Sequence, residues 1–250
     1  MDRISISDLG VLRFISSGSF AEVCQCEVEG KKYAFKKFFE PEKIIDKDFL
    51  NKMENLGKLH LCKSAVPKIL VTDDINDVGY LTELLVGKDY ILLEELSEKI
   101  DALKETKTAI YELHNNKIIH TDIHGCNIFI LKDGSSKLLD FDNASYLRKK
   151  PNKENYSDFA FNFVKKYGLS NKLDIYLFNL LTFASLNNCK LEEVAKLIFC
   201  GEYGVFNTKE AKKICDSLTL EKIKFNSDYL IDAVCLEEVE KIYQLKKALY

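Results

Sequence analysis

One segment, from Ile118 to Ala144, constrains the fold of this 250-residue chain more than any other. It contains two short apolar runs, Ile128 to Leu131 and Lys137 to Leu139, with the turn residues Asp133 and Gly134 between them. Two such runs joined by an Asp-Gly turn are typical of a β-hairpin. The sequence therefore predicts that this part of the chain folds back on itself as two antiparallel strands.

Polar side chains flank the predicted hairpin. Asn127 stands just before the first strand and Asp140 just after the second, so antiparallel pairing is expected to bring them together. Amide and carboxylate oxygens are hard ligands that suit Mg²⁺. Asp122 lies in a loop five residues before Asn127 and adds a further acidic group. We therefore expect a magnesium site here that serves a polyanionic substrate.

The residues around these positions resemble the protein kinase family. His120 to Asn127, HTDIHGCN, is similar to the kinase catalytic loop H-R-D-L-x-x-x-N, and Asp140 to Asp142, DFD, resembles the D-F-G that follows it. The resemblance implies that Asp122 is the catalytic base and that Asn127 and Asp140 bind Mg²⁺. The alternative for either motif alone is a polar turn between core strands.

A second resemblance lies near the N-terminus. The kinase glycine-rich loop, G-x-G-x-x-G-x-V, is similar to residues 16–23 with only the middle glycine kept. Small residues in such a loop let backbone N–H groups approach phosphates, although Ser and Ala restrict φ where Gly does not. The pattern positions, which the resemblance assigns to nucleotide binding, are Ser16, Gly18, Ala21 and Val23.

Ala34-Phe35-Lys36 resembles the V-A-I-K strand of the same family. The resemblance implies that Lys36 binds the α- and β-phosphates of ATP and that Ala34 and Val23 cover the adenine ring. Both Lys36 and its neighbour Lys37 would be ordinary strand-edge residues in the alternative interpretation.

The family also has a helix glutamate that orients this lysine. Apolar residues recur at helical spacing from Ile44 to Leu61 and predict that helix. Glu54 is the glutamate well inside the segment, so it is assigned as the catalytic partner of Lys36. Glu54 lies at the edge of the apolar stripe, and a surface position without this role is the alternative.

Residues 67–71 and 79–84 predict two more strands, which complete a five-stranded sheet with three strands between Val11 and Phe38. The sequence from Tyr80, YLTELLVGKDY, resembles the kinase hinge. Thr82 would then be the gatekeeper residue, and the backbones of Glu83 and Leu85 would face the adenine edge.

The predicted fold class is α+β, a bilobal protein-kinase-like fold in a single domain of residues 1–250. Residues 1–85 form a five-stranded antiparallel N-lobe and residues 86–250 an abbreviated helical C-lobe. The resemblance covers about residues 11–186 and includes Asp174, which would hold the backbone of the catalytic loop. A short helix is predicted within residues 158–166, and no A-P-E sequence follows it.

Two departures from the family bear on mechanism. Thr121 replaces the arginine of H-R-D, so activation through a phosphorylated loop is not expected. His124 stands where Ser/Thr kinases usually carry lysine and is similar to the small-molecule branches of the superfamily. His124 would steady the transferred phosphoryl group when protonated, or shape the loop.

Composition bounds the partners. A net charge of −3 gives no basic excess for nucleic acid, and Arg148 to Lys150 is a local cluster typical of a solvated face. No apolar run is long enough to span a membrane, and no signal peptide is recognised. The eight cysteines, mostly in apolar segments, favour reduced thiols and a cytoplasmic location.

Two other groups of residues are alternative candidates for a metal site. Cys24 and Cys26 have no second Cys/His pair at zinc spacing, so they are interpreted as core residues. The second candidate metal site is the group of His120, Asp122 and His124. The residues between them are typical of a loop, and no third histidine follows nearby.

The resemblance implies a phosphotransferase that uses ATP and Mg²⁺ and moves the γ-phosphoryl group to a hydroxyl acceptor. A Ser/Thr protein kinase with a protein acceptor is the preferred interpretation. The alternatives are a small-molecule kinase acting on a sugar or lipopolysaccharide-type acceptor, and a pseudokinase that binds nucleotide without turnover. The sequence does not define the acceptor or the oligomeric state.

Overall fold

The computed structural model describes residues 1–146, 160, 164 and 168–186, which fall into two units. The first unit combines Met1–Lys88 with Phe129–Asp142. The second combines Asp89–Ile128 with the described residues from Asn143 onward. The segment that contains the hairpin strands therefore groups with the N-terminal part of the chain.

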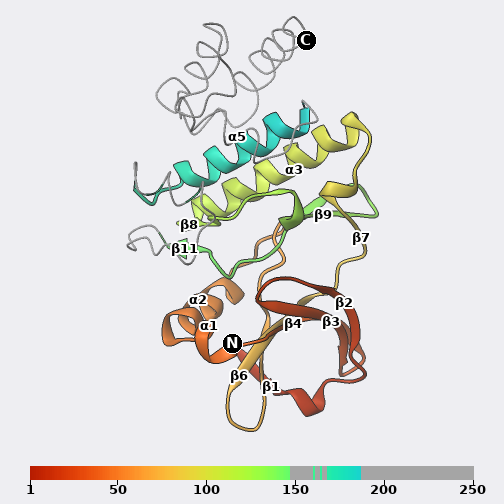
Figure 1. The fold of residues 1–250 in the computed structure, drawn as a ribbon, viewed down its shortest axis with the longest axis vertical. Helices are drawn as coiled ribbons and strands as arrows, with labels where there is room; N and C mark the ends of the chain where they lie inside the picture. Colours follow the sequence, from red (N-terminus) through yellow and green to blue (C-terminus); the bar gives the residue numbers. More distant parts are fainter. Residues whose placement is uncertain (147–159, 161–163, 165–167, 187–250) are drawn as a thin grey trace, which may run out of the picture. The chain divides into compact units, whose positions relative to one another are not determined.

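The first unit contains a six-stranded sheet, in the order β1-β5-β6-β4-β3-β2 (Figure 1). All neighbours are antiparallel except β1, which runs parallel to β5. The strands are β1 (Asp2–Ser5), β2 (Arg13–Ser17), β3 (Ala21–Val28), β4 (Lys31–Phe38), β5 (Ile69–Thr72) and β6 (Asp77–Glu83).

The prediction of five antiparallel strands is correct for β2 to β6 and misses β1. The physical reason is that β1, DRIS, has four residues and no apolar alternation, and its partner β5 lies far along the chain. The short 3₁₀-helix η1 (Ile6–Asp8) follows it.

Alternation along the central strands separates two faces of the sheet. On one face a core forms from Cys26, Phe35 and Leu81, together with Leu9 and residues of β5 and β6. Cys24 and Cys26 are both buried free thiols, as expected for core residues. Burial raises the pKa of each thiol. The tight turn between β3 and β4 places Glu29 and Gly30 at positive φ, as a two-residue hairpin turn requires.

Two helices replace the single helix predicted from Ile44 to Leu61. They are α1 (Pro41–Ile44) and α2 (Lys47–Gly57). Asp46 separates them because its side chain accepts a hydrogen bond from the N–H of Phe49 at 2.7 Å and caps the start of α2. Phe49, Met53 and Leu56 of α2 are buried.

A small sheet, in the order β10-β9-β7, contains the predicted hairpin. Its strands are β7 (Gly87–Asp89), β9 (Ile128–Leu131) and β10 (Ser136–Leu138). In the turn, Gly134 has φ +85 and its N–H donates to the carbonyl of Leu131 at 3.0 Å. At Gly87 an added Cβ would lie 1.8 Å from the carbonyl oxygen of Ile130, so only glycine allows this close pairing.

The described part of the second unit is mainly helical. Its elements are η2 (Tyr90–Leu92), α3 (Leu96–Asn115), β8 (Ile118–Ile119), η3 (Gly125–Asn127), β11 (Ser145–Tyr146) and α5 (Lys172–Leu186). Helices α3 and α5 lie side by side (Figure 1), with Ile110 and Leu113 of α3 and Tyr176 and Phe178 of α5 buried.

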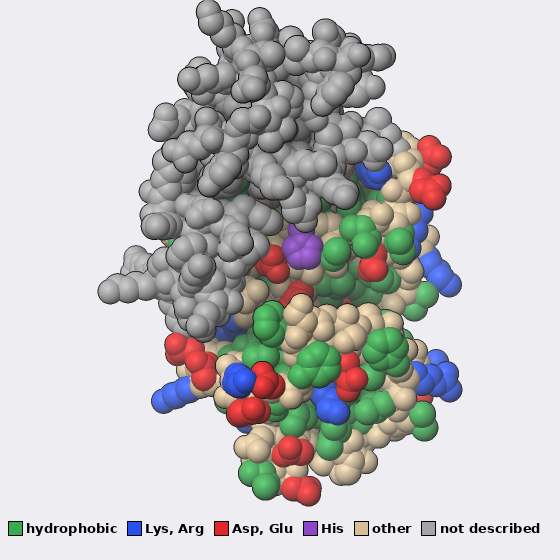
Figure 2. Space-filling model, in the orientation of Figure 1, with side chains coloured by type: hydrophobic (Ala, Val, Ile, Leu, Met, Phe, Trp, Pro, Cys, Tyr) green, Lys and Arg blue, Asp and Glu red, His purple; other side chains and the backbone are tan. Residues whose placement is uncertain are grey.

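Hydrophobic side chains remain at the surface of the first unit, between charged side chains (Figure 2). Strand β2 is exposed throughout, in keeping with its place at the sheet edge, and Phe14 and Ile15 are among its exposed side chains. None of the described helices combines the length and apolarity needed to cross a membrane. The basic cluster at 148–150 and, apart from residues 160 and 164, the helix predicted within 158–166 lie outside the described residues.

Candidate active site

Five of the residues predicted to bind nucleotide share one face of the large sheet. The register pairs Val23 with Lys36 and Ala34 with Thr82, and directly paired residues of an antiparallel ladder project to the same side. Phe35 projects to the opposite side, into the core. The residues on the shared face are Ser16, Val23, Ala34, Lys36 and Thr82.

The loop before β3 contains the other two predicted loop positions. The N–H of Gly18 donates to the carbonyl of Ala21 at 2.9 Å, which closes a tight turn between β2 and β3. Ala21 is buried at the start of β3. The two residues therefore help shape the turn, and their contact with phosphate stays a prediction.

The predicted hinge begins within β6 and continues past its end at Glu83. The carboxylate of Glu83 pairs with the ammonium group of Lys137 in β10, and Leu85 is half-buried. This ion pair ties the end of β6 to the hairpin by a contact that the sequence did not suggest.

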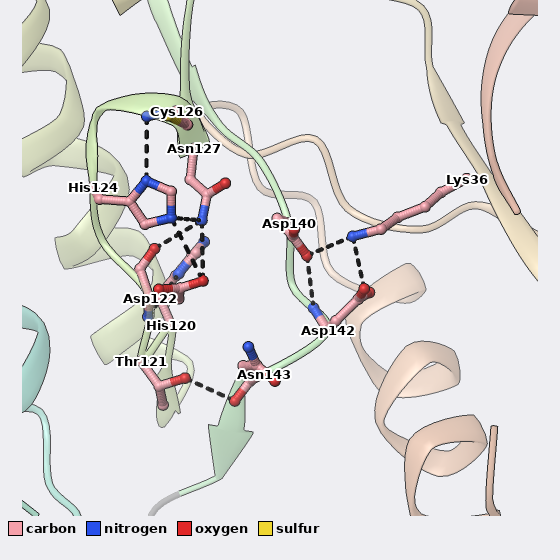
Figure 3. Close-up of polar contacts among 10 residues, drawn as sticks. All are labelled: Lys36, His120, Thr121, Asp122, His124, Cys126, Asn127, Asp140, Asp142 and Asn143. Atoms are coloured by element: carbon pink, nitrogen blue, oxygen red, sulfur yellow. Dashed lines mark hydrogen bonds and ion pairs between the residues drawn. The ribbon is translucent and has the colours of Figure 1, made fainter. Parts of the chain in front are cut away.

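Lys36 lies between two carboxylates of the DFD motif (Figure 3). Its Nζ is 2.8 Å from Oδ1 of Asp140 and 2.7 Å from Oδ2 of Asp142. Burial by itself lowers the pKa of Lys36, but the two carboxylates outweigh it and raise that pKa above its ordinary value. Lys36 is therefore held as a cation on the face that was predicted to bind nucleotide.

Asp142, the last residue of the DFD motif, is a further residue of the site. The hydroxyl of Tyr80 donates to its Oδ1 at 2.7 Å, and the ammonium group of Lys52 donates to its backbone carbonyl. Burial, together with the charge of Asp140, raises the pKa of Asp142. The signal in the sequence was a carboxylate at the position where the related motif has glycine.

Glu54 does not contact Lys36. Its carboxylate lies 4.0 Å from the amino group of Met1. Among the described residues, the carboxylates that pair with Lys36 come from Asp140 and Asp142. The expected Lys36–Glu54 pair is therefore corrected. The physical reason is that Lys52, two residues earlier, reaches the DFD segment, and residues two apart in a helix project to nearly opposite sides.

Asp140 itself has an unusual backbone, with φ +60. This left-handed conformation is uncommon for a residue with a side chain, although Asp tolerates it better than most. The N–H of Asp142 lies 3.4 Å from Oδ1 of Asp140, and Phe141 between them is buried. The segment after β10 is thus a sharp turn around a buried ring.

The second unit contains the catalytic-loop segment. Asp174 is fully buried, and its carboxylate accepts hydrogen bonds from the backbone N–H groups of His120 and Thr121, each at 2.8 Å. Nε2 of His114 lies 2.9 Å from the same carboxylate. The prediction that Asp174 holds the backbone of this loop is confirmed.

Asp122, His124 and Asn127 form a polar cluster in this loop (Figure 3). Nδ2 of Asn127 donates to the backbone carbonyl of Asp122 at 2.9 Å and lies 3.4 Å from its Oδ2. The side chain of His124 lies 3.6 Å from the same carboxylate oxygen. Burial raises the pKa of Asp122, but the hydrogen bond and charge of His124, with contributions from His120 and Asn127, bring it below its ordinary value.

His124 shapes the loop. Its Nδ1 accepts a hydrogen bond from the N–H of Cys126 at 3.3 Å and so caps η3. Its Nε2 lies 3.0 Å from Nδ2 of Asn127, so His124 also contacts the side chain of that residue. His120 is buried, and its Nδ1 lies 3.4 Å from the N–H of Asp122. Across the described part of the chain, no three His, Cys, Asp or Glu side chains are grouped to hold a metal ion.

A model of a known protein family covers the site residues described above. The model of the protein kinase domain matches residues 9–191, which is more than half of the chain. This chain belongs to the protein kinase domain family. The structure agrees with this assignment, since the kinase domain has a multi-stranded N-terminal sheet followed by helices.

Curated relatives of this kinase domain carry kinase names. It is 25% identical over 192 residues to mitogen-activated protein kinase kinase kinase dlk-1 of Caenorhabditis elegans, a match that covers 74% of this chain and 20% of that protein. It is 30% identical over 148 residues to serine/threonine-protein kinase greatwall of Homo sapiens, covering 55% of this chain and 16% of that protein. The kinase domain spans about a fifth or less of the length of these relatives.

Proposed function

We propose that this kinase domain transfers the γ-phosphoryl group of ATP to the hydroxyl group of a protein serine or threonine. The observation that supports this most directly is the position of Asp122. Its carboxylate stands in a loop that Asp174 fixes through two backbone N–H groups, and the hydrogen bond and charge of His124 help to keep the pKa of Asp122 below its ordinary value. A fixed carboxylate suits the orientation of an acceptor hydroxyl.

Phosphoryl transfer is catalysed mainly by positioning the reactants and by neutralising their charge. The acceptor oxygen attacks the γ-phosphorus, the bond from that phosphorus to the leaving oxygen of ADP breaks, and the acceptor proton passes to Asp122. Lys36 is proposed to bind the α- and β-phosphates, on the sheet face that also carries Ala34 and Thr82. In that role Lys36 would exchange its contact with Asp140 for one with phosphate.

Asn127 and Asp140 are the residues we propose as Mg²⁺ ligands. In Asn127 the amide nitrogen is bound to the backbone carbonyl of Asp122, which leaves Oδ1 available as a hard oxygen ligand. Asp140 offers a carboxylate that is 37% exposed. Mg²⁺, when bound, would neutralise phosphate charge.

The preference for a protein acceptor draws on the names of the relatives, one of which is called a serine/threonine-protein kinase. A small-molecule acceptor is the second candidate, because His124 stands where Ser/Thr kinases usually carry lysine. We also propose a cytoplasmic location, from the cysteine usage of the sequence.

The test is incubation of the full chain with γ-labelled ATP and Mg²⁺, with protein substrates in one series and sugars in another. Asp122→Asn is the inactive comparison, and Asp133→Asn, at the exposed hairpin turn, is the matched control. Asp122-dependent label on protein supports the proposal. Label on sugars alone supports the second candidate, and nucleotide binding without transfer to either series supports the pseudokinase alternative.

A further inference from the structure

In protein kinases the lysine that binds the phosphates is held by a carboxylate in the active state. Lys36 has two carboxylate partners, Asp140 and Asp142. Asp140 is proposed above as a metal ligand, so it would leave Lys36 when Mg²⁺ and ATP enter. Asp142 is then the carboxylate that can remain.

Asp142 is held in place by contacts to both of its carboxylate oxygens. Its Oδ2 lies 2.7 Å from Nζ of Lys36, and its Oδ1 accepts the hydroxyl hydrogen of Tyr80 at 2.7 Å. Each oxygen thus has its own donor, and the side chain is only 16% exposed. Tyr80 is itself buried and packs against the rings of Phe38 and Phe49. The carboxylate is therefore held by a rigid aromatic cluster.

The sheet register supports the same grouping. Lys36 of β4 and Tyr80 of β6 are directly paired across the antiparallel ladder, so both project to one face, where Asp142 meets them. Helix α2 reaches this group through Lys52, whose ammonium group donates to the backbone carbonyl of Asp142. The helix thus contacts the DFD segment with a cation instead of contacting Lys36 with a glutamate.

We propose that Asp142, held by Tyr80, is the positioning residue that orients Lys36 toward the triphosphate of the nucleotide, and that Glu54 has no part in this. The inference rests on the proposed function, because it concerns the contact between Lys36 and phosphate. Asp142 acts through Lys36 and does not touch the reacting atoms.

The experiment compares two ligands in the presence of Mg²⁺, a non-hydrolysable ATP analogue and adenosine, by calorimetry on the full chain. The inference predicts that Asp142→Asn weakens binding of the ATP analogue at least tenfold while adenosine binding changes less than twofold, because only the triphosphate meets Lys36. Asp133→Asn is the matched control, and Glu54→Gln tests the rival partner. Equal or tighter binding of the analogue by Asp142→Asn overturns the inference, as does a selective loss in Glu54→Gln.

A double-mutant cycle separates positioning from a general structural role. In a Lys36→Met background, Asp142→Asn should cause no further loss of ATP-analogue affinity, whereas independent, additive losses overturn the inference. Should Asp142→Asn fail to fold, Tyr80→Phe decides. It keeps the ring and removes only the hydrogen bond, and it should weaken the analogue severalfold and leave adenosine unchanged. An unchanged affinity in Tyr80→Phe overturns the inference.

The two proposals fail in different ways. A wild-type chain that binds neither ligand overturns the proposed function. A wild-type chain that binds the ATP analogue tightly, with Asp142→Asn binding it equally well, overturns the positioning role of Asp142 alone.

Discussion

Asp174 holds Thr121 in a left-handed backbone conformation. Thr121 has φ +71, and its N–H donates to Oδ1 of Asp174 at 2.8 Å. A β-branched residue in this region is strained, and such strain persists only where surrounding contacts enforce it. The hydroxyl of Thr121 also donates to the carbonyl of Asn143 at 2.8 Å. The loop that contains Asp122 is thus fixed by a buried carboxylate.

Asp174→Asn should destabilise the chain. The amide can accept at one oxygen only, so one of the two backbone N–H groups loses its acceptor, and the contact with His114 loses its charge. We expect a loss of about 2 kcal/mol in the free energy of unfolding, measured in urea. Asp133→Asn is the control for a carboxylate that bonds only within its own turn and should cost less. Equal stability of Asp174→Asn and the wild type would contradict the assignment.

Asp122→Asn should abolish most of the transfer and leave the fold intact. The carboxylate that accepts the acceptor proton is lost, and such groups typically contribute about 10²- to 10⁴-fold. The initial rate with labelled ATP measures the effect, and the thermal unfolding midpoint shows whether the fold is kept. A rate within threefold of the wild type would remove Asp122 from the mechanism.

His124→Gln should shift the acid limit of the reaction to higher pH. The pKa of Asp122 lies below the ordinary 3.8. The ionised form that transfer requires is therefore present at pH 3.8 and above, and it is lost as the pH falls through the lowered pKa. His124 contributes to this lowering, and its removal raises the pKa. The measurement is kcat/KM against pH for both proteins, together with their stability at each pH. An acid limb at the same pH in both would show that His124 does not tune Asp122.

Gly87→Ala should weaken the first unit. The new Cβ would meet the carbonyl oxygen of Ile130 at 1.8 Å, so β7 and β9 would have to separate. We expect a loss of about 2 kcal/mol or more in unfolding free energy. Gly18→Ala is the matched control, since its Cβ would have ordinary contact at 3.9 Å. Similar stabilities for the two variants would argue against the close strand pairing.

Cys24 and Cys26 should resist thiol reagents in the folded protein. Both are buried, and burial raises the pKa of each thiol, which lowers the thiolate fraction. Cys62 and Cys126 are exposed and should react before these two, although burial of its sulfur also raises the pKa of Cys126. Peptide mapping after brief alkylation at pH 8 measures the order. Early modification of Cys26 would contradict the core assignment.

Local chemistry explains which features were predictable from the sequence. Strand β4 lies within the region that was predicted to form strands because its alternation and flanking turn are strong, and the hairpin follows from Asp133 and Gly134. The role of Asp174 came from a family resemblance and is confirmed by its two backbone hydrogen bonds.

Long-range partners were the part that the sequence could not supply. Glu54 was chosen for its place in a helix, yet helical periodicity does not say which side chain of α2 reaches the DFD segment; Lys52 does so. Similarly, nothing local marks Tyr80 as the donor to Asp142, since 62 residues separate them. The parallel pairing of β1 with β5 is missed for the same reason.

Phe35 and Lys36 project to opposite faces of the large sheet. They are neighbours on β4, and its ladders to β3 and β6 set which side each one takes. A slip of one residue would move the ammonium group into the apolar cluster and the phenyl ring out of it. A buried, unpaired cation is so costly that the slipped sheet would not be stable. The register that buries Phe35 in the core therefore also places Lys36 on the opposite face. A chain that folds stably must have this lysine in its correct position.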